Sequence, residues 1–388
     1  MNKIGKLINE LCPNGVEYKE IGEIFTVKNG YTPSKNKPEF WDDGDIPWFR
    51  LEDIRNNGKI LNESIQHITE KAVKGNLFKK NSLMVATTAT IGIHALIEVD
   101  FLCNQQLTCV TIKDEYENYL NIKFYYYYFD LVDKECIRIA NNGGGMPIVS
   151  LEKMKKIKVP VPPLDVQYEI VRILDKFSLL SSELSNELIA RQRQYDFYKY
   201  KLLSNDSIEH KLGEVANIKT GVKPKDILDK GDYEYINAGT TNSGYVNETN
   251  FNGDVVTTPS RGQGGIGYVG YQNKDFWLGP LCYAIWSKDE TVLINKYLYY
   301  ELSSKKDEIL KRKNTGGVPA LNGVDLKTIP LNIPSIEEQQ KIVAILDKFE
   351  EICENTSSGL PAEIEKRQKQ YEYYRDILFN FKEVEVNE

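Results

Sequence analysis

The sequence predicts an α+β protein with two homologous mixed α/β domains, separated by two long helices that pair as an antiparallel coiled coil with approximate two-fold internal symmetry. Three observations support this fold class. The octapeptide IVRILDKF at 170–177 recurs as IVAILDKF at 342–349, the flanking sequences also align, and each copy begins a long amphipathic helical pattern. The predicted boundaries are 1–158 for the first domain, 159–204 for the central helix, 205–332 for the second domain, 333–381 for the C-terminal helix and 382–388 for a tail.

The repeat extends through both halves of the chain. Upstream of the octapeptides, segment 143–162 lies over segment 315–334 at the same offset of 172 residues. Near the start of each domain, GEIFTVKNGYTP matches GEVANIKTGVKP at an offset of 191 residues. A repeat unit of roughly 180 residues is too long for a solenoid and indicates two copies of one domain. The tyrosine runs at 125–129 and 297–300 also align, and their helical spacing favours core packing over base stacking.

Each octapeptide begins a helix whose apolar residues lie alternately three and four positions apart. This average spacing of about 3.5 residues is typical of coiled coils, and a helix over 166–203 would be about 57 Å long. We expect the two helices to pair through Ile170, Leu174, Phe177, Leu184, Leu188, Tyr195, Tyr198, Ile342, Leu346, Phe349, Leu360, Ile364, Tyr371 and Tyr374. Gly359 and Pro361 predict a kink or break near 355–361. The alternative is two separate amphipathic helices, each packed on its own domain.

The composition indicates a folded protein without a membrane span. Hydrophobic residues make up 41% and charged residues 27% of the 388 positions, and no run of about 18 apolar residues occurs. The N-terminus lacks the apolar core of a secretion signal, and the six cysteines form no CxxC pair, so we expect reduced thiols in the cytoplasm. The net charge of −7 argues weakly against nucleic-acid binding, but the acidity is concentrated in the helical and terminal stretches, which permits a basic face elsewhere.

No catalytic motif stands out in the sequence. The glycine-rich GQGGIGYVG at 262–270 lacks the GKS or GKT of a phosphate-binding loop, and there is no GxSxG, HExxH or methyltransferase signature. The three histidines, His67, His94 and His210, stand alone, so we expect no metal site and no cofactor in this chain. A catalytic carboxylate pair stays open as an alternative, but nothing in the sequence singles one out. The chain is therefore interpreted as a binding protein.

Polar, aromatic and basic residues gather in irregular segments, where nucleic-acid contacts are made by such side chains. The candidates for DNA contact are Lys28, Asn29, Tyr31, Lys35, Arg50, Thr88, Thr90, Lys219, Lys223, Lys225, Ser260, Arg261 and Gln263. Arg261 has the guanidinium fork that binds a guanine edge, and Gln263 has the amide that binds adenine. The alternative is an ordinary polar surface, because the loops of any protein carry residues of these types.

These motifs and their order along the chain closely resemble the specificity subunit of Type I restriction–modification enzymes. The resemblance rests on GDIPWFRLEDI at 44–54, ATIG at 89–92, DVVTTPSRGQGGIGYVG at 254–270 and the helix ends RQRQYDFY and RQKQYEYY, and it covers essentially the whole chain. It implies two target-recognition domains, each reading one half of a split double-stranded DNA sequence. Segments 31–120 and 222–290 align poorly while their flanks align well, as two readers of different half-sites should.

The resemblance also implies a set of partners. Two methyltransferase subunits and two restriction subunits would join this noncatalytic chain, and they would carry S-adenosylmethionine, ATP and Mg²⁺. SSEL at 181–184 and SNEL at 185–188 form a tandem repeat of a kind that, in the family, sets the gap between half-sites. Four helical residues add about 6 Å, or between one and two base pairs. Two other classes stay open: a noncatalytic coiled-coil adaptor, and the detached specificity region of a fused nuclease–methyltransferase.

Overall fold

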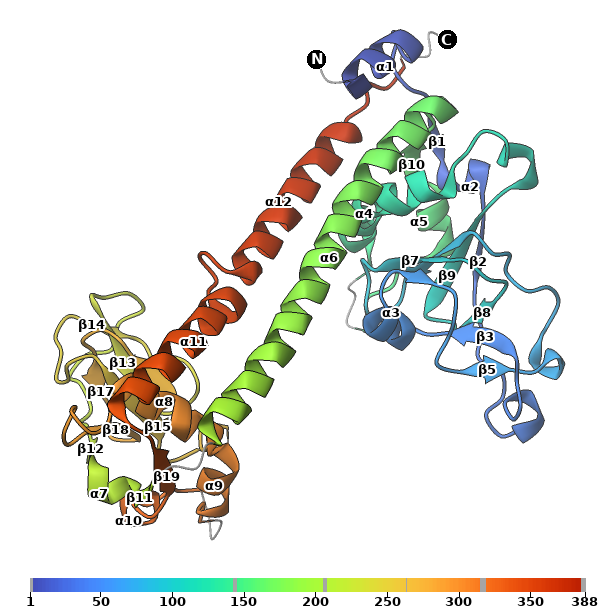
Figure 1. Ribbon diagram of the computed structural model, residues 1–388. Helices are drawn as coiled ribbons and strands as arrows, with labels where there is room; N and C mark the ends of the chain where they lie inside the picture. The colour runs from blue at the N-terminus through green and yellow to red at the C-terminus, as the bar shows by residue number, and fades with distance from the viewer. Residues whose placement is uncertain (1–2, 142–144, 205–207, 263, 315–318, 385–388) are drawn as a thin grey trace. The chain divides into compact units, whose positions relative to one another are not determined.

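The computed structural model describes residues 3–141, 145–204, 208–262, 264–314 and 319–384. The chain divides into two compact units, the first formed by Met1–Ser182 together with Lys366–Glu388 and the second by Glu183–Glu365. Both units combine helices with small sheets, so the predicted two-domain α+β fold is confirmed (Figure 1). Among the described residues, no helix combines the length and the apolar character that crossing a membrane requires.

The first unit is built on a five-stranded sheet in the order β2-β9-β6-β7-β4, beside a three-stranded sheet β5-β3-β8 and a strand pair β1-β10. Its strands are β1 (Tyr18–Glu20), β2 (Phe25–Asn29), β3 (Ile46–Phe49), β4 (Ile60–Leu61), β5 (His67–Ile68), β6 (Ser82–Ala86), β7 (His94–Ile97), β8 (Leu102–Cys103), β9 (Leu107–Ile112) and β10 (Lys158–Pro160). Its helices are α1 (Lys3–Leu11), α2 (Ile21–Ile24), α3 (Leu51–Asn57), α4 (Ile122–Ile139) and α5 (Leu151–Lys155), with short 3₁₀ turns at Pro38–Phe40, Glu70–Ala72 and Asp114–Tyr116.

The second unit repeats this arrangement except for strand β4. Its sheets run β12-β18-β15-β16, β14-β13-β17 and β11-β19. The strands are β11 (Ile208–Lys211), β12 (Ala216–Thr220), β13 (Tyr233–Ile236), β14 (Tyr245–Val246), β15 (Val255–Pro259), β16 (Gly270–Gln272), β17 (Trp277–Leu278), β18 (Cys282–Ser287) and β19 (Pro330–Ile333). The short helices are α7 (Leu212–Val215), α8 (Asn295–Ser304), α9 (Lys306–Lys311) and α10 (Gly323–Leu326). In the described residues, the sheet order of the first unit differs only by the added strand β4.

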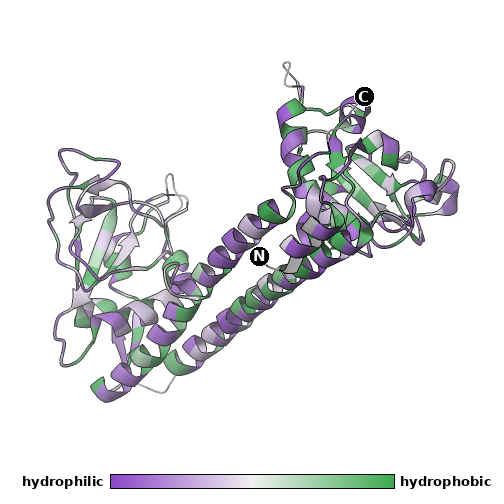
Figure 2. Cartoon of the chain, turned by 90° about the horizontal axis from the view of Figure 1, so that it is seen from above, coloured by the Kyte–Doolittle hydropathy of each residue, from purple (hydrophilic) through white to green (hydrophobic). Residues whose placement is uncertain are grey.

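The central strands β6 and β15 of the two main sheets are buried on both faces, which explains their apolar runs. Along β6, Leu83 and Val85 join the core that includes α4, whereas Met84 and Ala86 join the core on the other face. This alternation follows from the two-residue period of a strand. Figure 2 shows apolar residues on the strands and along one side of the helices. The tyrosine runs pack in these cores as predicted, with Tyr125 and the equivalent tyrosines of α8 buried.

Three long helices complete the units: α6 (Leu164–Leu203), α11 (Ile336–Glu354) and α12 (Leu360–Leu378). The break predicted near 355–361 is confirmed by the gap between α11 and α12. In the first unit, Ile170 near the start of α6 shares a core with Leu378 at the end of α12. In the second unit, Leu203 at the end of α6 shares a core with Ile342 near the start of α11. The helices therefore pair antiparallel within each unit, as predicted (Figure 1).

Aromatic residues of the predicted seam meet in both units. The rings of Phe177 and Tyr374 stack with centroids 5.4 Å apart in the first unit, and Phe349 lies 6.1 Å from Tyr195 and 5.7 Å from Tyr198 in the second. Apolar members of the seam that enter the cores are Ile170, Leu174, Ile342 and Leu346. Tyr371 packs against the first core, and Leu184, Leu188, Leu360 and Ile364 are half-buried.

A buried glutamine fastens each long helix to its own sheet domain. The Gln167 amide donates to the carbonyls of Pro162 and Tyr119 at 2.7 and 2.9 Å, and its Oε1 accepts from the Asn121 amide at 2.7 Å. Gln339 makes the same three contacts in the second unit, to Pro334, Val292 and Ile294. The glutamine in the first turn of both repeated helices therefore satisfies backbone groups that burial would otherwise leave unpaired.

Candidate nucleic-acid interface

Most of the candidate residues of the first unit lie at one edge of the main sheet. Strand β9 runs antiparallel to both β2 and β6, and β7 runs antiparallel to β6. The C-terminal ends of β2 and β6 and the N-terminal ends of β9 and β7 are therefore adjacent. This edge, which we call the loop edge, carries Lys28 and Asn29 on β2 and the loop 87–93 after β6. The sequence segments VKNGYT and TTATIG thus converge, although about 60 residues separate them.

Side-chain hydrogen bonds join these segments. The Thr108 hydroxyl donates to Asn29 Oδ1 at 2.7 Å and lies 2.8 Å from the Thr87 hydroxyl. On the neighbouring loop, the Thr32 hydroxyl donates to Gln105 Oε1 at 2.5 Å. Because this bond uses the Gln105 oxygen, the amide NH₂ of this exposed residue can still donate to a ligand. The loop edge thus holds polar groups in fixed positions.

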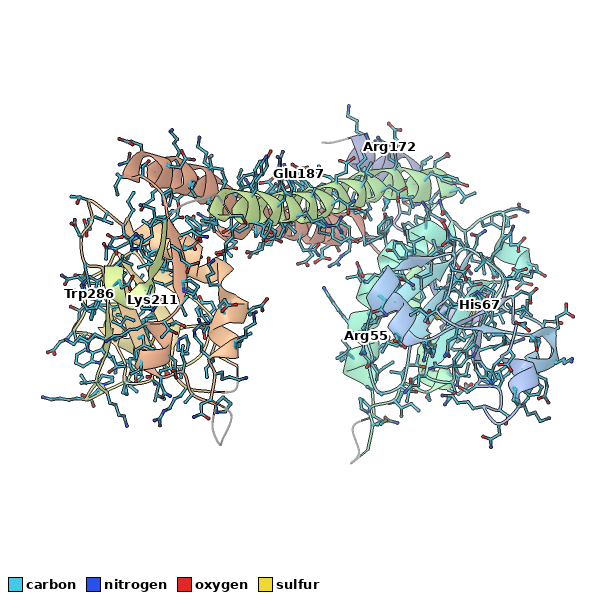
Figure 3. The ribbon with its side chains drawn as sticks, turned by 60° about the horizontal axis from the view of Figure 1, so that its bottom comes forward. Arg55, His67, Arg172, Glu187, Lys211 and Trp286 are labelled. Atoms are coloured by element: carbon cyan, nitrogen blue, oxygen red, sulfur yellow. The ribbon has the colours of Figure 1, made fainter. Side chains whose placement is uncertain are left out.

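The ATIG loop at 89–92 is held from the other side by the segment before α5. Ala89 has a φ of 66° and donates its amide hydrogen to the Pro147 carbonyl at 2.9 Å, and the Val149 amide donates to Thr87 at 2.9 Å. Arg55 of α3 approaches the same loop, with Nη2 3.5 Å from the Thr90 hydroxyl. Figure 3 labels Arg55 on its helix in the first unit. A cationic side chain therefore borders the candidates Thr88 and Thr90.

The second unit builds an equivalent loop edge with different side chains. Lys219 lies on β12, and Ser260 and Arg261 follow β15. Gly262 has a φ of 116° and donates to the Pro319 carbonyl at 3.2 Å, while the Leu321 amide donates to Ser260 at 2.8 Å. These bonds match those of Ala89 and Thr87 in the first unit.

The repeated backbone pairing shows which positions correspond. Thr88 forms an isolated bridge with Ile148, and Arg261 forms one with Ala320. The same backbone position therefore carries the short hydroxyl side chain of Thr88 in the first unit and the exposed guanidinium of Arg261 in the second. Burial raises the pKa of Tyr283, so this phenol stays neutral and donates to the Leu321 carbonyl at 3.1 Å, which supports the strand segment opposite Arg261. The two edges share a backbone and differ in chemistry.

Several candidates are placed less favourably for contact with a ligand. The Tyr31 hydroxyl donates to the Ala72 carbonyl at 3.1 Å and accepts from the Lys74 amide at 2.6 Å, so both bonds commit it to segment 72–74. Arg50 pairs with Glu52 at 2.8 Å, and Ser260 is 7% exposed. Lys35, Lys223 and Lys225 are exposed on loops beyond the sheet edges. Gln263 lies outside the described residues.

The structure adds polar residues to the loop edge that the sequence analysis did not select. Arg55, Thr32 and Gln105 belong to this group. Gln105 stands in the segment CNQQL immediately before a buried strand, where a loop at the sheet edge is the expected position for polar side chains. Without the partner strand, the sequence offered no signal that this loop meets Thr32.

Comparison with known proteins gives concordant results. The family model for the Type I restriction modification DNA specificity domain matches residues 13–191 and again 205–366. The chain is 36% identical over 366 residues to the Type I restriction enzyme EcoprrI specificity subunit of Escherichia coli, a match that covers 86% of this chain and 88% of that protein. The crystal structure of a Type-I restriction-modification system S subunit from M. genitalium superposes with a TM-score of 0.59 and 20% identity, over 94% of this chain and 95% of that one. A chain from a type I R-M system structure, solved in work on complex assembly and conformational transition, superposes with a TM-score of 0.58 and 17% identity, over 95% and 98%.

Proposed function

Because the chain belongs to the Type I restriction modification DNA specificity family, we propose that each of its two units reads one half of a split double-stranded DNA target through its loop edge. The observation that carries this proposal is the pair of equivalent loop edges with unlike side chains. Thr88 and Arg261 occupy matching backbone positions, yet only the second offers a guanidinium fork. Two units with the same backbone and different side chains at the loop edge would select two different half-sites.

The same family membership supports a wider assembly. We propose that the chain acts with two methyltransferase subunits and two restriction subunits, and that S-adenosylmethionine, ATP and Mg²⁺ bind to those partners. The chain itself would contribute specificity and no turnover. The coiled-coil adaptor and the fused-enzyme fragment are not favoured, because the family model covers both halves of the chain as DNA specificity domains.

The proposal is tested by a map of modified adenines. The chain is co-expressed with its methyltransferase subunit in a host free of DNA methylation, and modified positions are read by single-molecule sequencing. A split motif with a fixed gap between two unlike halves is the expected result. A soluble, intact complex that modifies no defined motif would overturn the proposal.

Arg261→Ala makes the test specific to the second unit. Loss of a bidentate contact to guanine removes about 1–3 kcal/mol of discrimination, so preference at one position of one half-site should fall by roughly 5- to 150-fold while the other half-site is unchanged. Lys274→Ala is the matched control, because this exposed cation follows β16 at the opposite edge of the same sheet. An unaltered motif in the Arg261 variant would remove Arg261 from the interface without affecting the broader proposal.

A further inference from the structure

A cavity of about 480 Å³ lies in the first unit and is lined by residues of α4, α6, α12 and the start of β7. His94, Asp130 and Asp133 meet in its wall, and their ligating atoms all lie within 4.8 Å of one another. Asp130 and Asp133 are three residues apart on α4 and therefore share a face of that helix. His94 does not stand alone as the sequence suggested, because β7 brings it against α4, a helix that begins almost 30 residues later.

The orientation of His94 is the one found in metal-bound imidazoles. Its Nε2 lies 2.8 Å from the Tyr126 carbonyl, and since a carbonyl only accepts, this nitrogen carries a hydrogen. Its Nδ1 then faces Asp133 Oδ2 at 2.7 Å. Metal-binding histidines commonly donate their second nitrogen to a backbone carbonyl, which fixes the ring and points the other nitrogen at the ion.

Asp133 supplies a second and independent observation. This residue is 4% exposed, and its Oδ1 has no hydrogen-bond partner among the described residues. Buried carboxylate oxygens are almost always paired, because an unpaired one loses its hydration without compensation. An unpaired oxygen in the wall of a cavity, beside an oriented imidazole and a second carboxylate, marks a position for a cation.

The internal repeat shows that the fold does not need these polar groups. Gly92 and Gly267 both have positive φ, at 90° and 94°. A Cβ added to Gly92 would meet Ile137, and one added to Gly267 would meet Leu310, so these two pairs correspond. The strand registers give the same alignment, because β7 pairs with β6 as β16 pairs with β15.

With this alignment, the second unit has Val269 at the position of His94 and Lys306 at the position of Asp133. Asp130 corresponds to Ser303. The same architecture is thus built with an apolar residue and a cation where the first unit places an imidazole and a carboxylate. The cluster of His94, Asp130 and Asp133 is therefore specific to the first unit, and the shared fold does not explain it.

We propose that His94, Asp130 and Asp133 bind one divalent transition-metal cation, of the class of Zn²⁺ or Mn²⁺. One imidazole nitrogen with two carboxylates suits these ions, and water can complete the coordination from the cavity. The ion would replace the proton between His94 and Asp133. This departs from the expectation, drawn from the sequence, that the chain holds no metal.

The groups around Asp130 determine how tightly the proposed site would bind a metal ion. Its Oδ2 accepts from Tyr371 and Arg375, each at 3.1 Å, and its Oδ1 contacts Lys59 at 3.1 Å. The Lys59 side chain is 45% exposed and can turn to water when the ion binds. Lys134, Arg375 and Glu372 also face the cavity. The three cationic side chains Lys59, Lys134 and Arg375 outnumber Glu372, the one carboxylate of the lining besides the proposed ligands. Their repulsion lowers the affinity for a cation, so we expect weaker metal binding than at a structural zinc centre.

An ion at this position would act on the loop edge of the first unit alone. His94 begins β7 directly after the ATIG loop, so ligation ties the loop that carries Thr90 to helix α4. Metal binding is expected to stiffen the first reader and to leave the second unchanged. This consequence rests on the proposed function, whereas the binding itself does not.

Binding is measured on the purified full-length chain without DNA, after removal of metals by chelation. Zn²⁺ or Mn²⁺ in excess is expected to raise the Tm of the first unit by about 5 °C, with one ion bound per chain by calorimetric titration and, for Mn²⁺, by loss of the free-ion electron paramagnetic resonance signal. Mg²⁺ should cause no comparable shift, because it prefers oxygen ligands alone. The absence of any shift and of any bound ion would overturn the proposal and leave a proton-bridged pair.

Two variants and one control assign the ion to the cluster. Asp133→Asn keeps the shape of the side chain and removes its charge, and His94→Val installs the residue of the second unit; both should abolish binding. His67→Gln is the matched control, since His67 forms an exposed pair with Glu63 at 2.6 Å that could hold an adventitious ion. If His94→Val fails to fold, Asp133→Asn decides the matter. Retained binding in Asp133→Asn, or loss in His67→Gln, would overturn the assignment.

Discussion

The buried glutamine at the start of α6 offers a direct test of how the long helices are fastened to the units. Gln167 is fully buried and satisfies three backbone groups, at Pro162, Tyr119 and Asn121. The substitution Gln167→Met preserves the length of the side chain and its helix propensity, so the chief loss is these three hydrogen bonds. The variant isolates the polar contribution of the helix anchor.

The expected cost follows from the number of groups left unpaired. Each buried backbone donor or acceptor without a partner costs about 1–3 kcal/mol, so three such groups lower the free energy of unfolding of the first unit by roughly 3–9 kcal/mol. At about 2–4 °C per kcal/mol, the Tm of that unit should fall by about 6 °C at the least. Gln339→Met removes the equivalent contacts and should destabilise the second unit in the same way.

Domain-resolved hydrogen exchange with mass spectrometry, combined with urea unfolding, measures both effects. Protection should be lost in α4 and the first half of α6 for Gln167→Met, and in α8 and α11 for Gln339→Met. The control is Gln340→Met, which changes the exposed neighbour of Gln339 on the same helix. If Gln167→Met cost no more than this control, the glutamine would not be the anchor, and apolar packing alone would hold the helix.

Three further outcomes are expected. Deletion of SNEL at 185–188, inside the continuous helix α6, should shorten the preferred spacer by one or two base pairs and leave both half-sites unaltered, as read from the modified motif; an unchanged spacer would refute it. Burial raises the pKa of Glu301 above its ordinary value, so its contribution to stability is fully present below that value and is lost as pH rises through the folded pKa. Glu301→Gln should therefore be more favourable to the unfolding free energy at neutral pH than in acid, and equal effects at both pH values in urea titrations would contradict this. Phe379→Ala empties a buried site between the rings of α4 and should cost about 3–5 kcal/mol in the first unit alone, whereas Tyr373→Ala, at a position 63% exposed, should cost little; equal unfolding midpoints would exclude a core role for the C-terminal segment.

The fold could be predicted from the sequence because its signals are local and repeated. The octapeptides, the alternate spacing of three and four residues, and the Gly359 and Pro361 break are each visible within a short window, and each corresponds to an element of the structure. Repetition strengthened every signal, since an alignment of the chain with itself tests the same pattern twice. The strand order within the sheets carried no comparable local signal.

The candidate site was harder to predict from the sequence, because its contacts join residues that lie far apart in the chain. The loop edge is assembled by β-pairing between strands far apart in the chain, so Thr32 and Gln105 meet only once β2 and β9 are paired. His94 and Asp133 are likewise joined across 39 positions by the packing of β7 on α4. Residue type marked polar loops, but it could not separate Arg261, which is exposed, from Tyr31, whose hydroxyl is already hydrogen-bonded to segment 72–74.

The internal repeat also indicates which parts of each unit are free to change. The two glutamine anchors make matching sets of three hydrogen bonds, and the backbone bonds of Thr87 and Ser260 match as well. Where those constraints end, the units differ, with Thr88 opposite Ile148 in one and Arg261 opposite Ala320 in the other. The backbone bonds match in both units although the side chains differ, so a change of side chain at the loop edge should cost little in folding. Under the proposed function, such a change would alter which DNA bases are contacted. A chain built in this way can acquire a new half-site in one unit while the other unit and both helix anchors stay as they are.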